Sequence, residues 1–144
     1  MKCICMAREM GSSRLVYSIN EGDYMELHPT ATGKVLLAYA EEEFIKKVLD
    51  KTKLESFTPT TVVDKEAIRG ELSKIRQQGY ALNREGREAG VAAIAAPVFD
   101  FENKVPAALA IVGSAQRFTE ENTPVLLEQL LNATRGMSRL MGES

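Results

Sequence analysis

Two unbroken apolar runs in the second half of the chain constrain the fold most strongly. Val91–Phe99 and Val105–Gly113 are joined by Asp100–Lys104, in which Asp100 and Asn103 are typical turn residues. Neither run alternates cleanly between apolar and polar residues, which predicts an antiparallel hairpin of two central strands covered on both faces. Alanine recurs in both runs, at Ala92, Ala93, Ala95, Ala96, Ala107, Ala108 and Ala110. These small side chains leave room for a packed helix or for a ligand.

Helices are expected around this hairpin. Asp64–Gln78 has the clearest pattern, because Asp64 is an N-cap residue and Gly79 suits the left-handed position that ends a helix. The other expected elements are helices over Ala31–Ala40, Glu41–Lys51 and Thr119–Leu140, and strands over Cys3–Ala7, Leu15–Ile19 and Tyr80–Leu82, with a turn at Gly11–Ser13. The pattern indicates one unit without linkers or repeats. Its first strand begins so early that the domain looks clipped at its N-terminus.

Charge and composition exclude several classes of function. The 144 residues carry 18 Lys and Arg against 20 Asp and Glu, so the basic excess typical of a nucleic-acid surface is absent. The longest apolar run, Val91–Phe99, is about half the length of a membrane-spanning helix. Two cysteines are too few for a disulfide framework. We therefore expect a cytoplasmic protein that does not enter a membrane and does not bind DNA by itself.

Candidate catalytic and metal-binding residues are few. His28 is the only histidine, and no Gly-x-Ser-x-Gly segment accompanies it, so packing or capping is a better expectation than nucleophilic catalysis. Cys3 and Cys5 share one face of a strand, but structural zinc requires four ligands, so two small buried residues are the preferred interpretation. We expect no enzyme activity, no metal and no cofactor.

The start of the first expected helix is a candidate anion site. Pro29–Gly33 leads into this helix, and the free amides of Thr30, Ala31 and Thr32 could hold a carboxylate. An ordinary helix start with Thr30 as the N-cap explains the same residues, so both interpretations stay open.

Five segments, in order, resemble one family. They are Leu27–Ala38 (compare LHATAxGKALLA), Phe57–Val62 (LTPRTI), Ile75–Ala81 (VRxRGYA), Gly90–Asp100 (GVxCIAAPVFD) and Arg117–Thr119 (SRLTxER). All five are similar to signature segments of the effector-binding domain of IclR-type bacterial transcription regulators. Each segment is weak alone, whereas five in the same order and spacing are specific.

The resemblance implies an α+β, GAF-like fold: an antiparallel sheet with helices on both faces. It also implies a small organic effector, often a carboxylate, and assembly into homodimers or tetramers. In the family, DNA is held by an N-terminal winged helix that this sequence lacks, so the chain is expected to be a single effector-binding domain over residues 1–144, either dissected or naturally short.

The resemblance also implies which positions of this sequence correspond to the pocket residues of the family. Ala31 and Thr32 supply the amides that hold the ligand's carboxylate, and Asn83 stands where the family has an acidic residue. Ala93 replaces a cysteine, while Ala110 and Val112 replace two serines. The apolar wall falls at Tyr17, Met25 and Val91, and an arginine of the family is replaced by Val16.

These replacements leave few polar side chains in the implied pocket. An unpaired polar group of a buried ligand costs a few kcal/mol, so small hydroxy or keto acids should bind poorly. We expect an effector with an apolar or aromatic body and a carboxylate. A ligand-independent oligomerisation module is the alternative, favoured by the broad apolar stripe of Leu127, Leu130, Thr134, Met137 and Met141. Cysteine redox chemistry at Cys3 and Cys5 is a third and weaker possibility.

Overall fold

A three-stranded antiparallel sheet forms the centre of the chain. The structure is a computed structural model that describes residues 2–9 and 19–143. Strands β3 (Ala81–Arg84), β4 (Val91–Val98) and β5 (Ala107–Ser114) follow in that order, each antiparallel to the next. The connection between β4 and β5 is closed by a hydrogen bond from the Asp100 amide to the Lys104 carbonyl (2.9 Å), and Asn103 adopts a positive φ of 59°. The predicted hairpin is therefore confirmed.

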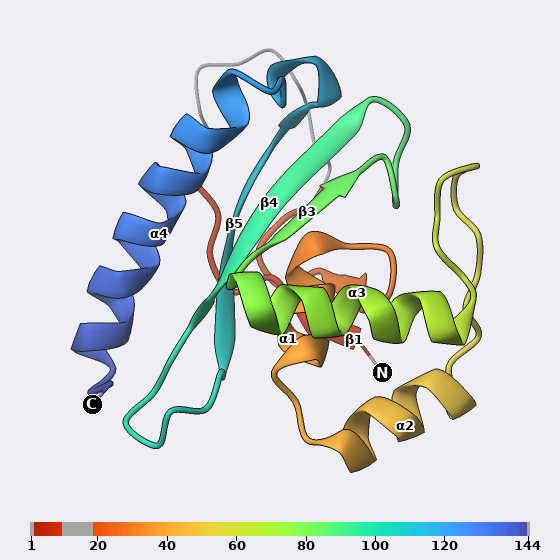
Figure 1. Ribbon diagram of the computed structural model, residues 1–144, viewed down its shortest axis with the longest axis horizontal. Coiled ribbons are helices and arrows are strands. Elements are labelled where there is room, and N and C mark those ends of the chain that lie inside the picture. Colours follow the sequence, from red (N-terminus) through yellow and green to blue (C-terminus); the bar gives the residue numbers. More distant parts are fainter. Residues whose placement is uncertain (1, 10–18, 144) are drawn as a thin grey trace.

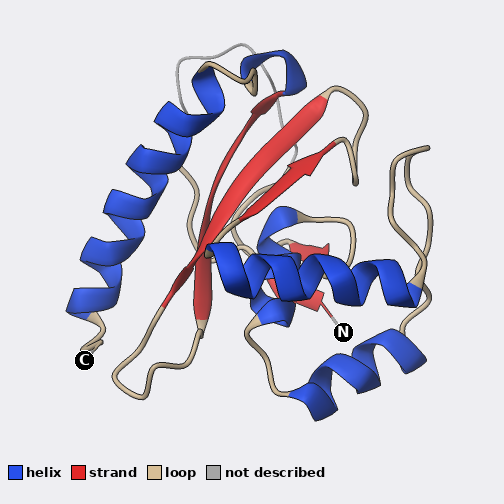
Figure 2. Cartoon of the chain, in the orientation of Figure 1, coloured by secondary structure: helices blue, strands red, loops and turns tan. Residues whose placement is uncertain are grey.

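Helices cover both faces of this sheet (Figures 1 and 2). One face packs on α1 (Ala31–Ala38), which α3 (Lys65–Gln78) and α2 (Glu42–Lys51) support from outside. The other face packs on α4 (Asn122–Leu140). This arrangement confirms the expected α+β class, with antiparallel strands between helices.

The alternation of side chains along the strands divides the core in two. Ala93 and Ala95 of β4 face α1, whereas Ala92, Ile94 and Ala96 face α4. Because successive strand residues point to opposite faces, every alanine of β4 contributes to one of the two layers. Small side chains on the α1 face let this short helix lie close to the sheet.

Local capping explains where the helices begin. The Thr30 hydroxyl accepts a hydrogen bond from the Gly33 amide (3.1 Å) and Asp64 accepts one from the Ala67 amide (2.9 Å), as N-cap residues do. Gly79 closes α3 with a φ of 87°. The α1 helix ends at Ala38 rather than at the expected Ala40, whose amide instead bonds the Leu37 carbonyl in a tighter turn.

The last helix starts three residues later than expected. Thr119 bonds the Asn122 amide through its side chain (3.0 Å) and the Thr123 amide through its carbonyl (2.9 Å), but α4 itself begins at Asn122. A short 3-10 helix, η1 (Ala115–Arg117), precedes this turn. Thr119 therefore organises the turn before the helix, and Glu121 occupies the N-cap position without a side-chain hydrogen bond.

The N-terminal segment forms a separate two-stranded ladder. Strand β1 (Lys2–Ile4) is antiparallel to β2 (Tyr24–Glu26), with Cys3 opposite Met25. The first strand is thus shorter than the expected Cys3–Ala7. Of the expected strand Leu15–Ile19 only Ile19 is described, and it is not in a strand; the expected turn at Gly11–Ser13 lies outside the described residues.

Strand β5 is covered on both faces, as expected: Ala108 and Ala110 pack on the α1 side, and Leu109 and Ile111 pack on the α4 side. Within residues 2–9 and 19–143 it pairs with β4 alone. Its apolar side chains also border a groove. No helix among the described residues is long and apolar enough to cross a membrane.

Candidate functional site

A small cavity at the N-terminal end of α1 brings together five of the nine residues implied by the family resemblance. These five are Ala31, Asn83, Val91, Ala93 and Val112; Thr30, Ala92, Arg87 and Glu88 complete the wall. They come from α1, from the three strands and from the connection between β3 and β4. The cavity volume is about 30 Å³, enough for a water-sized group or a carboxylate but far below the volume of a whole organic ligand.

The floor of the cavity follows from strand register. Ala93 of β4 and Val112 of β5 are directly opposed, and Asn83 of β3 is opposed to Ala93 on the other side. All three lie on the face of the sheet that packs against α1. Residues far apart in sequence therefore meet because each strand presents the same face.

The helix end above this floor offers two backbone donors. Gly33 donates to the Thr30 hydroxyl, but no described residue accepts a hydrogen bond from the Ala31 or Thr32 amide. Gly33 permits a close approach to the preceding segment, since a Cβ there would lie 2.5 Å from Leu27 Cα and from the Leu27 carbonyl oxygen. The positive end of the helix dipole favours an anion at such a position.

Asn83 lines the cavity with an amide whose two ends are already bound. Its Nδ2 donates to the Pro29 carbonyl (2.7 Å), and its Oδ1 accepts from Lys34 Nζ (3.4 Å). Lys34 is buried and forms an ion pair with Glu71 of α3 (2.7 Å). Asn83 therefore ties the loop before α1 to the sheet, with one hydrogen bond made at each end of its amide.

A much larger groove adjoins the cavity. It has a volume of about 1340 Å³ and runs between β1, α1, β5 and α4. Met25, Thr32, Ala110 and Val112 from the implied pocket lie along it. Val112 lines both spaces, so the cavity and the groove meet at this residue. Tyr17, the remaining residue of the implied set, and Val16 lie outside the described residues.

The groove is rich in exposed apolar side chains. Ile4 of β1, Phe44 of α2, and Val125 and Met137 of α4 all line it, and each is at least 40% exposed. Exposed apolar surface of this extent marks a binding region in soluble proteins. The groove is therefore suited to an apolar body, whereas the small cavity is suited to a polar head.

Arg87 is the main residue that sequence reasoning missed. Its Nε donates to Glu26 Oε2 (3.0 Å), and its guanidinium carbon lies 4.0 Å from the centre of the Phe57 ring. Burial alone would raise the pKa of Glu26, but backbone hydrogen bonding and Arg87 together hold this pKa below its ordinary value. The segment Arg84–Gly90 is charged and carries two glycines, as a solvated loop does, and no spacing in it distinguishes Arg87 from a solvated arginine.

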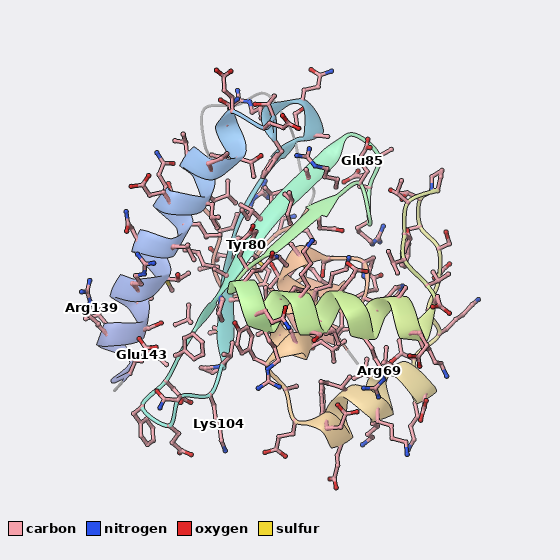
Figure 3. All side chains as sticks on the ribbon, in the orientation of Figure 1. Arg69, Tyr80, Glu85, Lys104, Arg139 and Glu143 are labelled. Atoms are coloured by element: carbon pink, nitrogen blue, oxygen red, sulfur yellow. The ribbon has the colours of Figure 1, made fainter. Side chains whose placement is uncertain are left out.

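A cluster of threonine hydroxyls fixes the connection that carries Arg87. Thr58 and Thr60 both donate to the Glu85 carbonyl, and Thr61 donates to the Gly86 carbonyl (2.6 Å). Figure 3 shows Glu85 at the end of the β3–β4 hairpin, beside the loop that precedes α3. This loop therefore holds the β3–β4 connection in place next to the cavity.

The remaining candidate residues are packed into the fold. His28 is 2% exposed, and its Nε2 lies 2.8 Å from the Glu55 carbonyl oxygen. Burial raises the pKa of the Cys3 thiol to about 11, while Cys5 lies just beyond β1 and is half-buried rather than buried as expected. Within the part of the chain that the structure describes, no three His, Cys, Asp or Glu side chains group as metal ligands.

Comparison with known proteins defines the class to which this chain belongs. Residues 2–139 match the family described as bacterial transcriptional regulator IclR C-terminal. The chain is 36% identical over 121 residues to the HTH-type transcriptional regulator XynR of Escherichia coli, a match that covers 84% of this chain and 48% of XynR. The chain therefore belongs to the IclR family of bacterial transcription regulators and corresponds to their C-terminal domain.

Solved structures agree with this assignment. The crystal structure of the Thermotoga maritima IclR has a TM-score of 0.87 and 32% identity, covering 92% of this chain and 53% of that chain. The inducer-binding domain of the PobR transcription factor from Acinetobacter, a double mutant in complex with 3-hydroxybenzoic acid, has a TM-score of 0.76 and 30% identity, covering 92% and 74%. The chain spans about half the length of the curated relatives it matches, and these are named as regulators of transcription rather than enzymes.

Proposed function

We propose that this chain is the effector-binding domain of its regulator and that it binds an organic acid in two parts. The carboxylate occupies the cavity next to the Ala31 and Thr32 amides, and the apolar body lies in the groove beyond Val112. The observation that carries the proposal is that Val112 lines both spaces, because a space of carboxylate size then lies beside a wide apolar one. The cavity alone is too small for a whole organic acid. The groove alone has no defined polar end that would hold a carboxylate.

The chemistry of the wall supports an apolar or aromatic body. Ala93, Ala110 and Val112 offer no hydrogen bonds through their side chains, and the Asn83 amide already makes one hydrogen bond at each end. A hydroxy or keto acid would find few side-chain partners for its second polar group there. The PobR domain carries an aromatic acid, which makes benzoates the first class to examine for this chain.

Thermal unfolding and titration calorimetry against matched pairs test the proposal. Benzoate, 3-hydroxybenzoate and hexanoate would each be compared with the corresponding neutral amide, and pyruvate and glyoxylate would be added as small keto acids. A specific acid at one hundred times its dissociation constant stabilises the domain by about 2.7 kcal/mol. Stabilisation by an apolar acid but not by its amide is expected. Tight binding of pyruvate or glyoxylate would contradict the apolar ligand class.

We also propose that the domain self-associates and that the whole regulator binds DNA in the bacterial cytoplasm through a winged-helix domain outside this chain. The exposed apolar residues at the end of α4, Leu140 and Met141, together with Phe101, supply a surface for a second copy. Sedimentation with and without effector tests this assembly. Stable dimers or tetramers that no compound in the panel alters or stabilises would favour the ligand-independent oligomerisation module instead.

A further inference from the structure

Arg87 is held in a fixed position at the wall of the cavity. Its Nε is bound to Glu26 of β2, and its guanidinium plane lies against Phe57 of the loop before α3. Neither terminal nitrogen donates a hydrogen bond to a described residue. The four N–H donors of the two terminal nitrogens therefore remain for a ligand, on a side chain whose orientation is already determined by two neighbours.

The backbone beneath Arg87 is equally restricted. Gly86 is buried so closely that a Cβ there would lie 2.4 Å from Asn83 Oδ1 and 3.0 Å from the Pro29 carbonyl oxygen. Its own carbonyl accepts the Thr61 hydroxyl at 2.6 Å. Binding through a long arginine side chain usually costs conformational entropy, because the side chain becomes ordered. Here Arg87 is already ordered by its contacts before a ligand binds, so this entropy cost is smaller.

We propose that Arg87 is the specificity-determining residue of the cavity: its terminal nitrogens bind the carboxylate of the effector and thereby select acids over their neutral analogues. The inference rests on the proposed function and adds to it a side-chain cation that the family resemblance does not supply. Arginine pairs with a carboxylate through two parallel hydrogen bonds, which are short and stronger than those between neutral groups. Phe57 and Glu26 act through Arg87 as positioning residues.

The charges around Arg87 set the expected strength of this contact. Glu26 neutralises part of the guanidinium charge, and Lys2 lies near enough to lower the pKa of Glu26. Glu88 also lines the cavity, but it is exposed, so water screens its repulsion of a ligand carboxylate. Glu88→Gln is therefore expected to strengthen binding of an acid modestly, whereas Arg87→Met weakens it strongly.

Acetate is the probe for the test because it fits the small cavity whatever body the natural effector has. The ¹⁵N-labelled domain would be titrated with sodium acetate, with sodium chloride at equal ionic strength as control, while the Arg87 Nε resonance and the Ala31 and Thr32 amides are followed. Arg87→Met identifies the Nε resonance and keeps the apolar stem on Phe57. Arg135→Met removes the same charge from an exposed position of α4 and is the matched control.

A saturable shift of the Arg87 Nε resonance by acetate, but not by chloride, is expected. Arg87→Met should weaken acetate about 10- to 100-fold, Arg87→Lys should restore part of the affinity, and Arg135→Met should leave it unchanged. No saturable shift of Arg87, or equal acetate affinity in Arg87→Met, would overturn the inference. A saturable Arg87 shift with no apolar acid binding more tightly than acetate would leave Arg87 in its role and refute the proposed function instead.

Discussion

Lys34 Nζ lies 2.7 Å from Glu71 Oε2, and the two side chains differ greatly in their contact with water. The Lys34 side chain is 6% exposed and the Glu71 side chain 32%. Through Asn83, the same ammonium group is linked to the loop that begins α1. The pair therefore joins α3, α1 and β3 directly behind the cavity.

Loss of the two partners should have unequal consequences. Glu71→Leu leaves a buried ammonium without its counter-charge and should destabilise the domain by about 3 kcal/mol, whereas Lys34→Met leaves a carboxylate on a side chain that is 32% exposed and should cost about 1 kcal/mol. Urea unfolding measures both. The double variant should lose less stability than the sum of the two, and a milder effect of Glu71→Leu than of Lys34→Met would contradict this account.

Two glycines in helices offer a matched pair. Gly33→Ala places a methyl group 2.5 Å from the Leu27 backbone and should destabilise the domain by more than about 2 kcal/mol. Gly70→Ala meets no atom within 4 Å on the exposed side of α3 and should stabilise the domain by about 0.5–1 kcal/mol. Thermal unfolding measures the change in stability for both. If both substitutions stabilise the domain, or both destabilise it, the close approach at Leu27 is refuted.

The two cysteines should differ in reactivity. Burial raises the pKa of Cys3 to about 11, so only about one thiol in a thousand is ionised at pH 8, and the side chain is 8% exposed. Alkylation by iodoacetamide, followed by mass spectrometry in Cys3→Ser and Cys5→Ser variants, should be much slower at Cys3 than at Cys5. Comparable rates in the folded domain would show that β1 opens readily.

The pair of Glu26 and Arg87 should contribute to stability only above acid pH. The pKa of Glu26 is lower in the folded state, because backbone hydrogen bonds and Arg87 outweigh burial. The contribution is complete above the pKa of an unfolded glutamate, about 4.3, and is lost as the pH falls through the folded pKa. Unfolding measured from pH 7 to pH 3 should therefore be less pH-dependent in Glu26→Gln. If stability falls with acid pH as much in Glu26→Gln as in the unchanged domain, the pair contributes nothing to the free energy of unfolding.

A larger side chain at Ala93 should close the cavity. Ala93→Leu adds three carbon atoms to the floor of a cavity of about 30 Å³, so binding of an acid should fall strongly while the sheet still forms. Ala89→Leu, at an exposed position that lines neither space, is the control. Titration calorimetry with the best acid of the panel compares them. Unaltered affinity in Ala93→Leu would place the carboxylate elsewhere.

Local signals predicted much of the fold. Asp64, Gly79 and Thr30 fix helix ends through contacts within a few residues, and the turn at Asp100–Lys104 follows from its own residue types. The unbroken apolar run of β5 likewise reflects its packing between α1 and α4. The same reasoning placed the start of α4 at Thr119, where the capping hydrogen bond exists but the helix begins later.

The candidate site was less accessible to sequence reasoning. Ala31, Asn83, Val91, Ala93 and Val112 were grouped by family resemblance, since no periodicity relates residues on four separate elements. Arg87 was missed because its role depends on Phe57 and Glu26, which are distant in sequence. The use of the Asn83 amide by Pro29 and Lys34 is likewise a tertiary effect, visible only once the loop before α1 meets β3.

The opposition of Ala93 and Val112 across β4 and β5 has a consequence for how such domains diversify. Val112 lines both the cavity and the groove, whereas Ala93 lines the cavity alone. Under the proposed function, single substitutions at these two positions on the floor of the sheet are expected to exchange one chemical signal for another, while the capping residues, turns and buried ion pair that maintain the architecture stay as they are.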